Sequence, residues 1–253
     1  MSREQTISAI ESLYQRAHDA LKERLSKDGR VSGALLNRHQ LGAHGLAYLA
    51  TELEACRQLA RWADQVDADY ERAIADAYIG EVARSFRGGV DLGPCESIPL
   101  SELGLSEKDV AETLGAEAVT AFIEERASGD AYLAIADRGA EAGFGDPGLF
   151  DEMLEEIRAQ FARFADEVVI PRAQEIHQKD ILIPMEILDR MSELGVFGLT
   201  IPEEFGGLGM SKVAMCVVTE ELSRGYIGVG SLGTRAEIAA ELILGGGTEE
   251  QKA

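Results

Sequence analysis

Apolar residues recur at every third or fourth position along most of this chain, which is the spacing that places them on one face of an α-helix. In the first half, the stripes predict helices over about residues 7–25, 35–63, 67–86 and 106–122. Alternating runs of β-branched residues that are long enough to build a sheet are absent. The pattern therefore predicts an all-α fold.

A glycine-rich stretch, Gly139-Ala-Glu-Ala-Gly-Phe-Gly-Asp-Pro-Gly148, is the clearest interruption of the helical pattern. Glycine adds backbone freedom, and an Asp-Pro pair favours a turn. We therefore expect three segments in the chain. They are an N-terminal helical bundle over residues 1–141, a linker over 142–149, and a second helical domain over 150–253.

The second domain also has a helical pattern, interrupted by prolines and glycines. Pro171 follows the first apolar stripe and is expected to kink or end its helix, because proline lacks a backbone donor. Pro184 suits the first turn of the next helix. The glycines of residues 206–209 predict a tight turn before a helix over 212–223. The last complete helix is expected over 228–244, where three glycines follow it.

The segment Thr248-Glu-Glu-Gln251 has the pattern of a capping box, in which the threonine and glutamine side chains satisfy backbone donors at the start of a helix. Only two residues follow it. A helix of that length does not form alone. We therefore expect this sequence to be the first part of a longer protein.

Charge and cysteine content exclude several classes of protein. The net charge of −21 is shared almost equally between the two halves, and it disfavours binding to nucleic acid or to anionic membranes. Cys56, Cys95 and Cys216 are widely spaced and have no pattern of zinc ligands. We expect Cys56 and Cys216 to be small buried residues. The first residues are polar and lack the apolar core of a signal peptide, and no apolar run in the sequence is long enough to span a bilayer, so we expect a soluble, cytoplasmic protein.

Four further patterns have ordinary structural interpretations. Gly206-Gly-Leu-Gly209 is expected to be a turn, because the strand and the Lys-Ser/Thr pair of a phosphate-binding loop are missing. His39 and His44 are five residues apart without metalloprotease spacing, so no metal site is expected. Glu203-Glu204 and Glu220-Glu221 are expected to be solvated ends of helices. None of these carboxylates is assigned as a general base.

The segment Leu199-Thr-Ile-Pro-Glu-Glu-Phe-Gly-Gly-Leu-Gly-Met-Ser211 resembles the loop between helices in the flavin-dependent acyl-CoA dehydrogenases. Its neighbours strengthen the resemblance, because Pro171–His177, Glu220–Gly225 and Gly245–Lys252 occur in the order and spacing of that family. Over roughly the last hundred residues, the chain is similar to the family's N-terminal helical domain.

The resemblance implies an FAD-dependent oxidation of an acyl-CoA thioester to the α,β-enoyl-CoA. An electron-transfer flavoprotein is the expected electron acceptor, and a homo-oligomer is the expected assembly. The catalytic glutamate of the family and most of the FAD contacts would lie beyond residue 253, so no catalytic residue is expected here and the cofactor-binding residues are unassigned. We expect this chain alone to be inactive.

The resemblance also implies that Gly230, Ser231, Thr234, Arg235 and Ile238 lie beside the acyl group. Independently of it, residues 231, 234, 235 and 238 share one face of a helix by their spacing. The alternative is that this face points to solvent. Ordinary members of the family begin near Phe150. A helical extension of this size is similar to that of a member acting on a dicarboxylic acyl-CoA.

A hypothesis from a different class is a non-catalytic helical interaction module derived from the same fold. The sequence downstream of residue 253 would distinguish the two. A β-rich segment followed by a glutamate would favour the enzyme.

Overall fold

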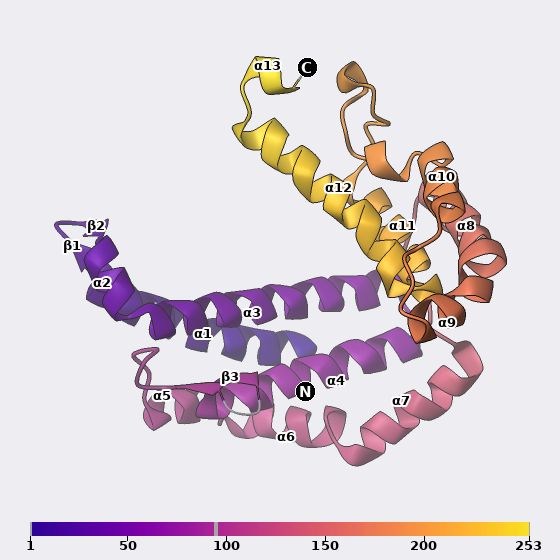
Figure 1. Cartoon of the computed structure of the whole chain (residues 1–253). Coiled ribbons are helices and arrows are strands. Elements are labelled where there is room, and N and C mark those ends of the chain that lie inside the picture. Colours follow the sequence, from indigo (N-terminus) through magenta and orange to yellow (C-terminus); the bar gives the residue numbers. More distant parts are fainter. Residues whose placement is uncertain (1, 94–95, 253) are drawn as a thin grey trace. The chain divides into compact units, whose positions relative to one another are not determined.

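The computed structural model describes residues 2–93 and 96–252, and it consists mainly of helices. The chain divides into two compact units, Met1–Gly148 and Leu149–Ala253. Figure 1 shows helices as the main elements of both units. The all-α prediction is confirmed.

The first unit is built on four helices that pack along one another. They are α1 (Arg3–Leu25), α3 (Gln40–Val66), α4 (Asp69–Ser85) and α6 (Glu117–Arg126). Their apolar stripes meet in a common core, in which Ile10, Leu13, Leu49, Leu53 and Ile79 are almost completely buried. Burial of aliphatic side chains of this size contributes about 1.5–3 kcal/mol each to folding. The core therefore joins residues that are far apart in sequence.

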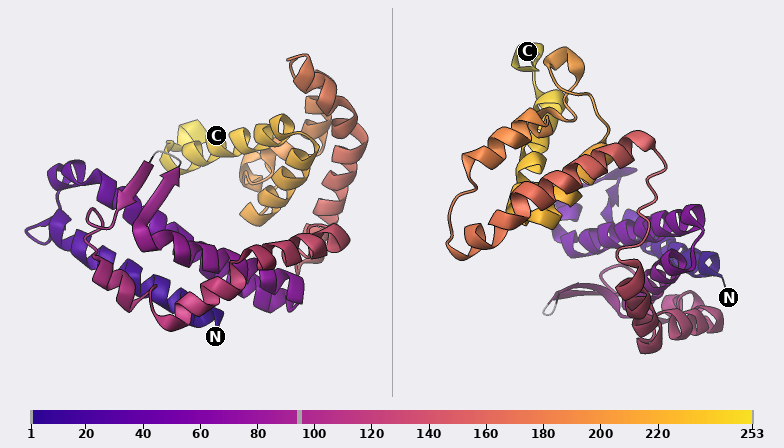
Figure 2. Two further views of the ribbon diagram at one scale, coloured as in Figure 1. Left: turned by 90° about the horizontal axis from the view of Figure 1, so that it is seen from below. Right: turned by 90° about the vertical axis from the view of Figure 1, so that its right-hand side faces the viewer.

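Shorter elements complete the first unit. They are β1 (Ser26–Lys27), β2 (Arg30–Val31), α2 (Gly33–Arg38), the 3₁₀ turn η1 (Phe86–Gly88), β3 (Gly89–Gly93), β4 (Glu96–Pro99), α5 (Glu107–Glu112) and α7 (Gly129–Ala142). The strands form two antiparallel hairpins, and Figure 2 shows β3 and β4 as a pair of arrows beside the helices. Strands of two to five residues are too short to give an alternating pattern that the sequence alone would reveal.

Two helices expected to be continuous are each divided in the structure. The helix expected over 35–63 consists of α2 and α3, because His39 leaves the helical conformation (φ −114°, ψ 28°) and its amide N–H donates to the carbonyls of Leu35 and Leu36. The helix expected over 106–122 consists of α5 and α6. Between them, the Gly115 N–H donates to the Val110 carbonyl at 2.7 Å. Glycine has low helix propensity, which favours an interruption at this point.

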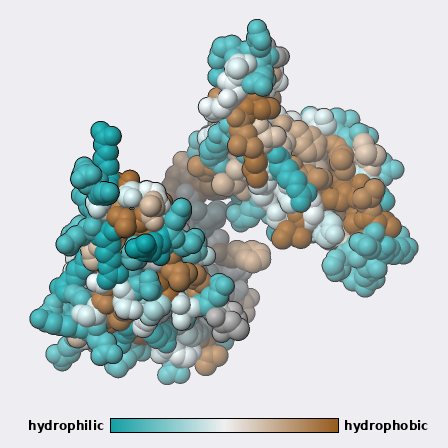
Figure 3. Space-filling view, turned by 60° about the vertical axis from the view of Figure 1, so that its left-hand side comes forward, coloured by the Kyte–Doolittle hydropathy of each residue, from teal (hydrophilic) through white to brown (hydrophobic). Residues whose placement is uncertain are grey.

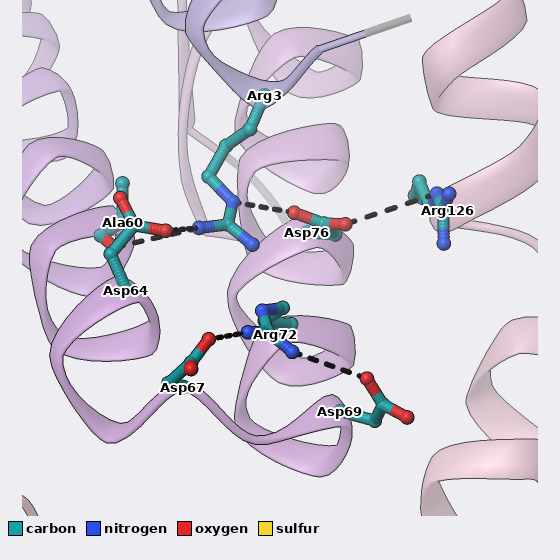
Figure 4. A network of polar contacts seen from close by, with 8 residues as sticks. All are labelled: Arg3, Ala60, Asp64, Asp67, Asp69, Arg72, Asp76 and Arg126. Carbon is teal, nitrogen blue, oxygen red and sulfur yellow. Dashed lines mark hydrogen bonds and ion pairs between the residues drawn. The ribbon is translucent and has the colours of Figure 1, made fainter.

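An arginine at the start of the chain connects three helices of the first unit (Figure 4). The Arg3 Nε donates to Asp76 Oδ1 on α4 at 2.6 Å, and its Nη1 donates to Asp64 Oδ1 on α3 at 2.9 Å. Asp76 also lies 3.8 Å from Arg126 on α6. The side chains of Arg3 and Asp76 are 13% and 14% exposed, so this pair is better shielded from solvent than most surface pairs. The network therefore fixes the first turn of α1 against the bundle.

The second unit begins with a helix that changes its winding. Its elements are α8 (Glu152–Phe164), the π-helical turn η2 (Ala165–Val169), α9 (Ile170–Gln178), α10 (Met185–Glu193), the 3₁₀ turns η3 (Val196–Gly198) and η4 (Glu203–Phe205), α11 (Lys212–Gly225), α12 (Ile227–Gly246) and α13 (Glu249–Lys252). Pro171 lies in the first turn of α9, directly after the π-helical turn. The wider turn accommodates a residue without an N–H, so the helical path continues through the proline.

The end of the second unit agrees in part with the expected helix boundaries. α12 includes Gly245 and Gly246 and ends at Gly247, so the glycines stop the helix later than expected. The Thr248 N–H donates to Gln251 Oε1 at 2.9 Å, which is one half of the expected capping box. The short helix α13 comes directly after it.

The connection between the two units is partly ordered on the first one. Residues 139–142, which the sequence suggested as flexible, continue α7. The Asp146 N–H then donates to Glu71 Oε1 at 2.8 Å, and its carbonyl accepts from Trp62 Nε1 at 3.1 Å. The linker over 142–149 remains a prediction. These contacts hold the connection to the first unit at Asp146, and they leave Phe144 and Phe150 exposed on either side of it.

We expect limited digestion with chymotrypsin to cut first at Phe144 and Phe150. Their side chains are 92% and 67% exposed, and the backbone around them lies outside helices. The two fragments should be visible by mass spectrometry before any other product. Earliest cleavage inside α3 instead would contradict a boundary at this position.

The described cysteines differ in environment. Cys56 is completely buried in the first unit, and burial, followed by the nearby Glu52 carboxylate, raises the pKa of its thiol to about 12. Cys216 is exposed, so the expectation that it is buried was wrong. The buried side of α11 is formed by Ala214, Val217 and Val218, and Cys216 falls between these positions on the outer side. Cys95 lies outside the described residues.

We expect iodoacetamide to alkylate Cys216 at least about 10²-fold faster than Cys56 in the folded protein at pH 8, because only a thiolate reacts and Cys56 is both protonated and inaccessible. A Cys95→Ser background isolates these two thiols, and peptide mass spectrometry measures each rate. Unfolding in urea should equalise them. Equal rates in the folded protein would show that Cys56 is not buried.

Candidate functional site

The loop between η3 and α11 is held by its own backbone. The amides of Leu208, Gly209 and Met210 donate to the carbonyls of Gly198, Ile201 and Leu199, each at 2.9 Å. Gly206 and Gly209 have positive φ angles of 83° and 59°, which glycine adopts without strain. These amides already have partners, so the loop is a structural turn and not a cradle for phosphate.

One side of α12 is packed tightly against the rest of the second unit. A Cβ atom at Gly230 would lie 2.0 Å from Ser223 Oγ and 2.8 Å from the Ser223 backbone nitrogen on α11. A Cβ atom at Gly233 would lie 2.9 Å from Val196 Cγ1 in η3. The two glycines therefore allow α12 to approach its neighbours more closely than any other residue would permit.

The other side of α12 carries four of the five predicted site residues. Ser231 and Thr234 are half-buried, Arg235 is exposed, and Ile238 is 55% exposed. The fifth, Gly230, is buried against α11. Contact of these five residues with a substrate stays a prediction.

The surface of this unit offers polar and apolar groups side by side. The Ser231 hydroxyl donates to the Gly228 carbonyl at 3.0 Å, whereas Arg235 forms no ion pair within residues 2–93 and 96–252. Ile227 and Leu242 extend the free side of α12 with side chains that are 74% and 71% exposed. Figure 3 shows hydrophobic side chains interspersed with polar ones on the surface that faces the viewer. The free side of α12 thus offers a cation, two hydroxyls and apolar side chains to a ligand.

A carboxylate that was expected to be solvated, Glu221 of α11, is buried against α8. Glu221 is 5% exposed, and it accepts from Arg158 Nε at 3.1 Å and from Arg224 Nε at 2.8 Å. Arg224 also donates to Asp166 Oδ1 in η2 at 2.8 Å. Hydrogen bonds that Arg224 donates to Asp166 and then to Glu221 raise the pKa of its guanidinium. The expectation of a solvated helix end was therefore wrong for Glu221. Its spacing from Val217 and Val218 was the available signal.

A second acidic residue missed by sequence reasoning connects α12 to the loop. Glu237 accepts from the Thr200 hydroxyl and from Lys212 Nζ, and the same lysine contacts Glu241. The Glu237 side chain is 10% exposed, whereas that of Glu241 is 52% exposed. Glu237 is thus the inner member of this group.

The histidine, cysteine and acidic side chains do not assemble into a metal site in the described part of the chain. Among residues 2–93 and 96–252, no group of three or more of them is arranged to hold a metal ion. Within the same residues, every helix is too short or too polar to cross a bilayer. The ring of His44 instead packs edge-on against Tyr48, with centroids 5.1 Å apart.

Comparison with known proteins gives consistent results. Residues 151–253 match the family model described as acyl-CoA dehydrogenase, N-terminal domain. The chain is similar to (2S)-methylsuccinyl-CoA dehydrogenase of Cereibacter sphaeroides, with 47% identity over 249 residues, which covers 96% of this chain and 45% of the relative. Isovaleryl-CoA dehydrogenase of Solanum tuberosum is 32% identical over 114 residues, covering 44% of this chain and 27% of the relative.

The comparisons differ in how much of the chain they cover. A probable acyl-CoA dehydrogenase of Bacillus subtilis is 33% identical over 89 residues, covering 35% of this chain and 15% of the relative. The Cereibacter protein, in contrast, is similar across most of both units. The chain spans less than half the length of these curated relatives. The second unit therefore belongs to the family of acyl-CoA dehydrogenase N-terminal domains, and the chain as a whole is similar to a member of the acyl-CoA dehydrogenases.

Proposed function

We propose that the protein containing this chain is an FAD-dependent acyl-CoA dehydrogenase, an oxidoreductase that converts an acyl-CoA thioester into the α,β-enoyl-CoA. The observation that carries the proposal is the 47% identity to a dehydrogenase of this family over 96% of the chain. The reaction removes a proton from the α-carbon and a hydride from the β-carbon. In this proposal, the group that accepts the proton and the group that accepts the hydride both lie outside the residues that the structure describes.

This chain contributes a wall of the substrate cavity. The free side of α12 would lie along the acyl group, with Ser231 and Thr234 at its centre and Ile238 toward its end. The closely packed glycines on the opposite side hold the helix against its neighbours, so the wall is present before substrate binds. Its role is to orient the acyl chain and exclude water.

FAD is the cofactor of the proposed reaction, and it accepts the hydride when bound. Neither the cavity at the start of α8 nor the free side of α12 suffices to hold it. A cavity of about 390 Å³ at the start of α8 is lined by Leu149, Phe150, Asp151, Glu152, Glu155 and Glu156. Its four carboxylates would repel the diphosphate of FAD. The free side of α12 is a single open face, so the FAD-binding residues are expected elsewhere in the protein.

We propose (2S)-methylsuccinyl-CoA as the substrate and mesaconyl-CoA as the product. The name of the Cereibacter relative supports this choice. Arg235 supports it independently, because a dicarboxylic acyl-CoA brings a free carboxylate that needs a cation once it is removed from water. A guanidinium can pair with a carboxylate through two hydrogen bonds.

The proposal extends to assembly and location. An electron-transfer flavoprotein is the proposed electron acceptor, and a homo-oligomer is the proposed state. The exposed apolar side chains of the second unit, among them Leu182 and Met185, are compatible with further protein contacts. The exposed thiol of Cys216 suits a reducing compartment, which supports a cytoplasmic location.

The direct test is to incubate the flavin-loaded protein with methylsuccinyl-CoA and an artificial electron acceptor. Mass spectrometry should detect a product that has lost two hydrogens, and the absorbance of the flavin should fall in the absence of the acceptor. A panel of monocarboxylic acyl-CoAs serves as the comparison. Absence of oxidation for every thioester would contradict the proposal.

A second candidate function is a non-catalytic helical interaction module. The exposed apolar side chains favour it to the extent that they indicate protein contacts. Such a module would bind neither FAD nor acyl-CoA. Equilibrium binding measurements separate the two candidates, because binding of FAD or acyl-CoA would contradict the module and binding of neither would contradict the enzyme.

A further inference from the structure

Three positions on the packed side of α12 determine how the helix is rotated about its axis. Gly230, Gly233 and Glu237 are three and four residues apart, so they lie on one side of the helix. The first two are in close contact with Ser223 and Val196. These glycine contacts limit how closely the helix approaches its neighbours. They contain no directional bond, so the glycine contacts alone would allow small rotations of α12 about its axis.

Glu237 adds the directional contacts that the glycines lack. Its carboxylate accepts from Thr200 in the loop and from Lys212 at the first position of α11. Two elements that flank α12 are thereby joined to one point on it. Hydrogen bonds to Glu237 and then to Glu241 raise the pKa of Lys212, so the lysine remains charged over the usual pH range.

The Glu237 contact lies within one turn of two predicted site residues on the same helix. Thr234 and Arg235 precede Glu237 by three and two residues, and they lie at the two edges of the free side of α12. One residue corresponds to about 100° around an α-helix. A rotation of half that angle would therefore bring one of the two side chains to the centre of the free side and turn the other toward its edge.

We propose that Glu237 is a positioning residue that sets the rotation of α12 and, through it, whether Arg235 reaches a carboxylate on the acyl group. The statement about Arg235 and the acyl group rests on the proposed function. The statement that Glu237 sets the rotation of α12 concerns this chain alone. Glu241 supplies a matched control, because it contacts the same lysine but is far more exposed.

The first experiment measures hydrogen exchange of α12 amides in this chain. Glu237→Gln should accelerate exchange by about tenfold, whereas Glu241→Gln should change it by less than about twofold. Thr200→Val should also accelerate exchange. In the double variant, exchange should be accelerated by less than the product of the two single-variant factors, because both changes remove the same interaction. Unchanged exchange in Glu237→Gln, or independent effects, would overturn the positioning role.

The second experiment uses the flavin-loaded enzyme. In Glu237→Gln, the ratio of kcat/KM for a dicarboxylic over a monocarboxylic acyl-CoA should fall about tenfold, with kcat for the monocarboxylic substrate changed by less than about threefold. Glu241→Gln should keep the original ratio. Faster exchange with an unchanged ratio would show that Glu237 is only structural.

The two experiments separate the inference from the proposed function. If the parent protein oxidises no acyl-CoA, the proposed function fails, and the exchange experiment alone decides whether Glu237 fixes α12. Faster exchange in Glu237→Gln then supports the positioning role within the chain, and unchanged exchange overturns it.

Discussion

Replacement of Arg235 by alanine is expected to lower kcat/KM for a dicarboxylic acyl-CoA by about 10²-fold while sparing a monocarboxylic analogue of similar length. The side chain is exposed on the free side of α12 and has no ion-pair partner in the part of the chain that the structure describes. A substrate carboxylate enclosed without such a cation would retain an unpaired charge, which costs several kcal/mol. Steady-state kinetics with the two substrates measures the effect.

The control for this experiment is Arg163→Ala, which removes an exposed arginine from α8, on another helix of the same unit. It should leave both substrates unaffected. Arg235→Lys should retain part of the selectivity, because lysine keeps the charge but not the paired hydrogen bonds. An equal loss for both substrates, or no loss, would return Arg235 to the solvent-facing interpretation and would remove the main residue-level support for a dicarboxylic substrate.

Replacement of Gly230 by alanine is expected to destabilise the second unit by about 3 kcal/mol or more. The added methyl group would lie 2.0 Å from Ser223 Oγ and 2.8 Å from the Ser223 backbone nitrogen. The hydroxyl can rotate away, but the backbone of α11 cannot move without disturbing the core around Leu222. The free energy of unfolding, measured in urea by circular dichroism, reports the loss.

Gly245→Ala is the matched control in the same helix. No atom lies within 4 Å of a Cβ built at Gly245, so this substitution gains helix propensity without a clash. We expect it to be neutral or to stabilise the unit by up to about 1 kcal/mol. Similar effects of the two substitutions would show that α11 and α12 are not closely packed at Gly230.

The sequence was sufficient to predict the elements whose pattern is long. The spacing of Ile10, Leu13 and Ala17 predicted α1, and these residues are now found completely buried. The glycines of residues 206–209 predicted a turn, because no other residue adopts positive φ at so little cost. The helix α12 was predicted to within two residues at each end.

The features that the sequence did not reveal either lack a local signal or depend on contacts between distant residues. The break at His39 has no proline or glycine at the same position, and its amide is satisfied within the preceding turn. Glu221 and Glu237 look like ordinary surface carboxylates until the basic and hydroxyl groups that surround them are known. The free side of α12 could be predicted from spacing, but its relation to Glu237 required the packing of the loop.

The Arg3 network has a consequence for synthesis on the ribosome. Arg3 and Asp76 are 73 residues apart, so α1 emerges long before the carboxylate that its first turn requires. At a translation rate of about 5–20 residues per second, this interval is several seconds. Helix formation takes less than about a microsecond. The nascent α1 is therefore expected to wait as an amphipathic helix with its apolar side uncovered, and it becomes a ligand for chaperones until α4 has left the exit tunnel.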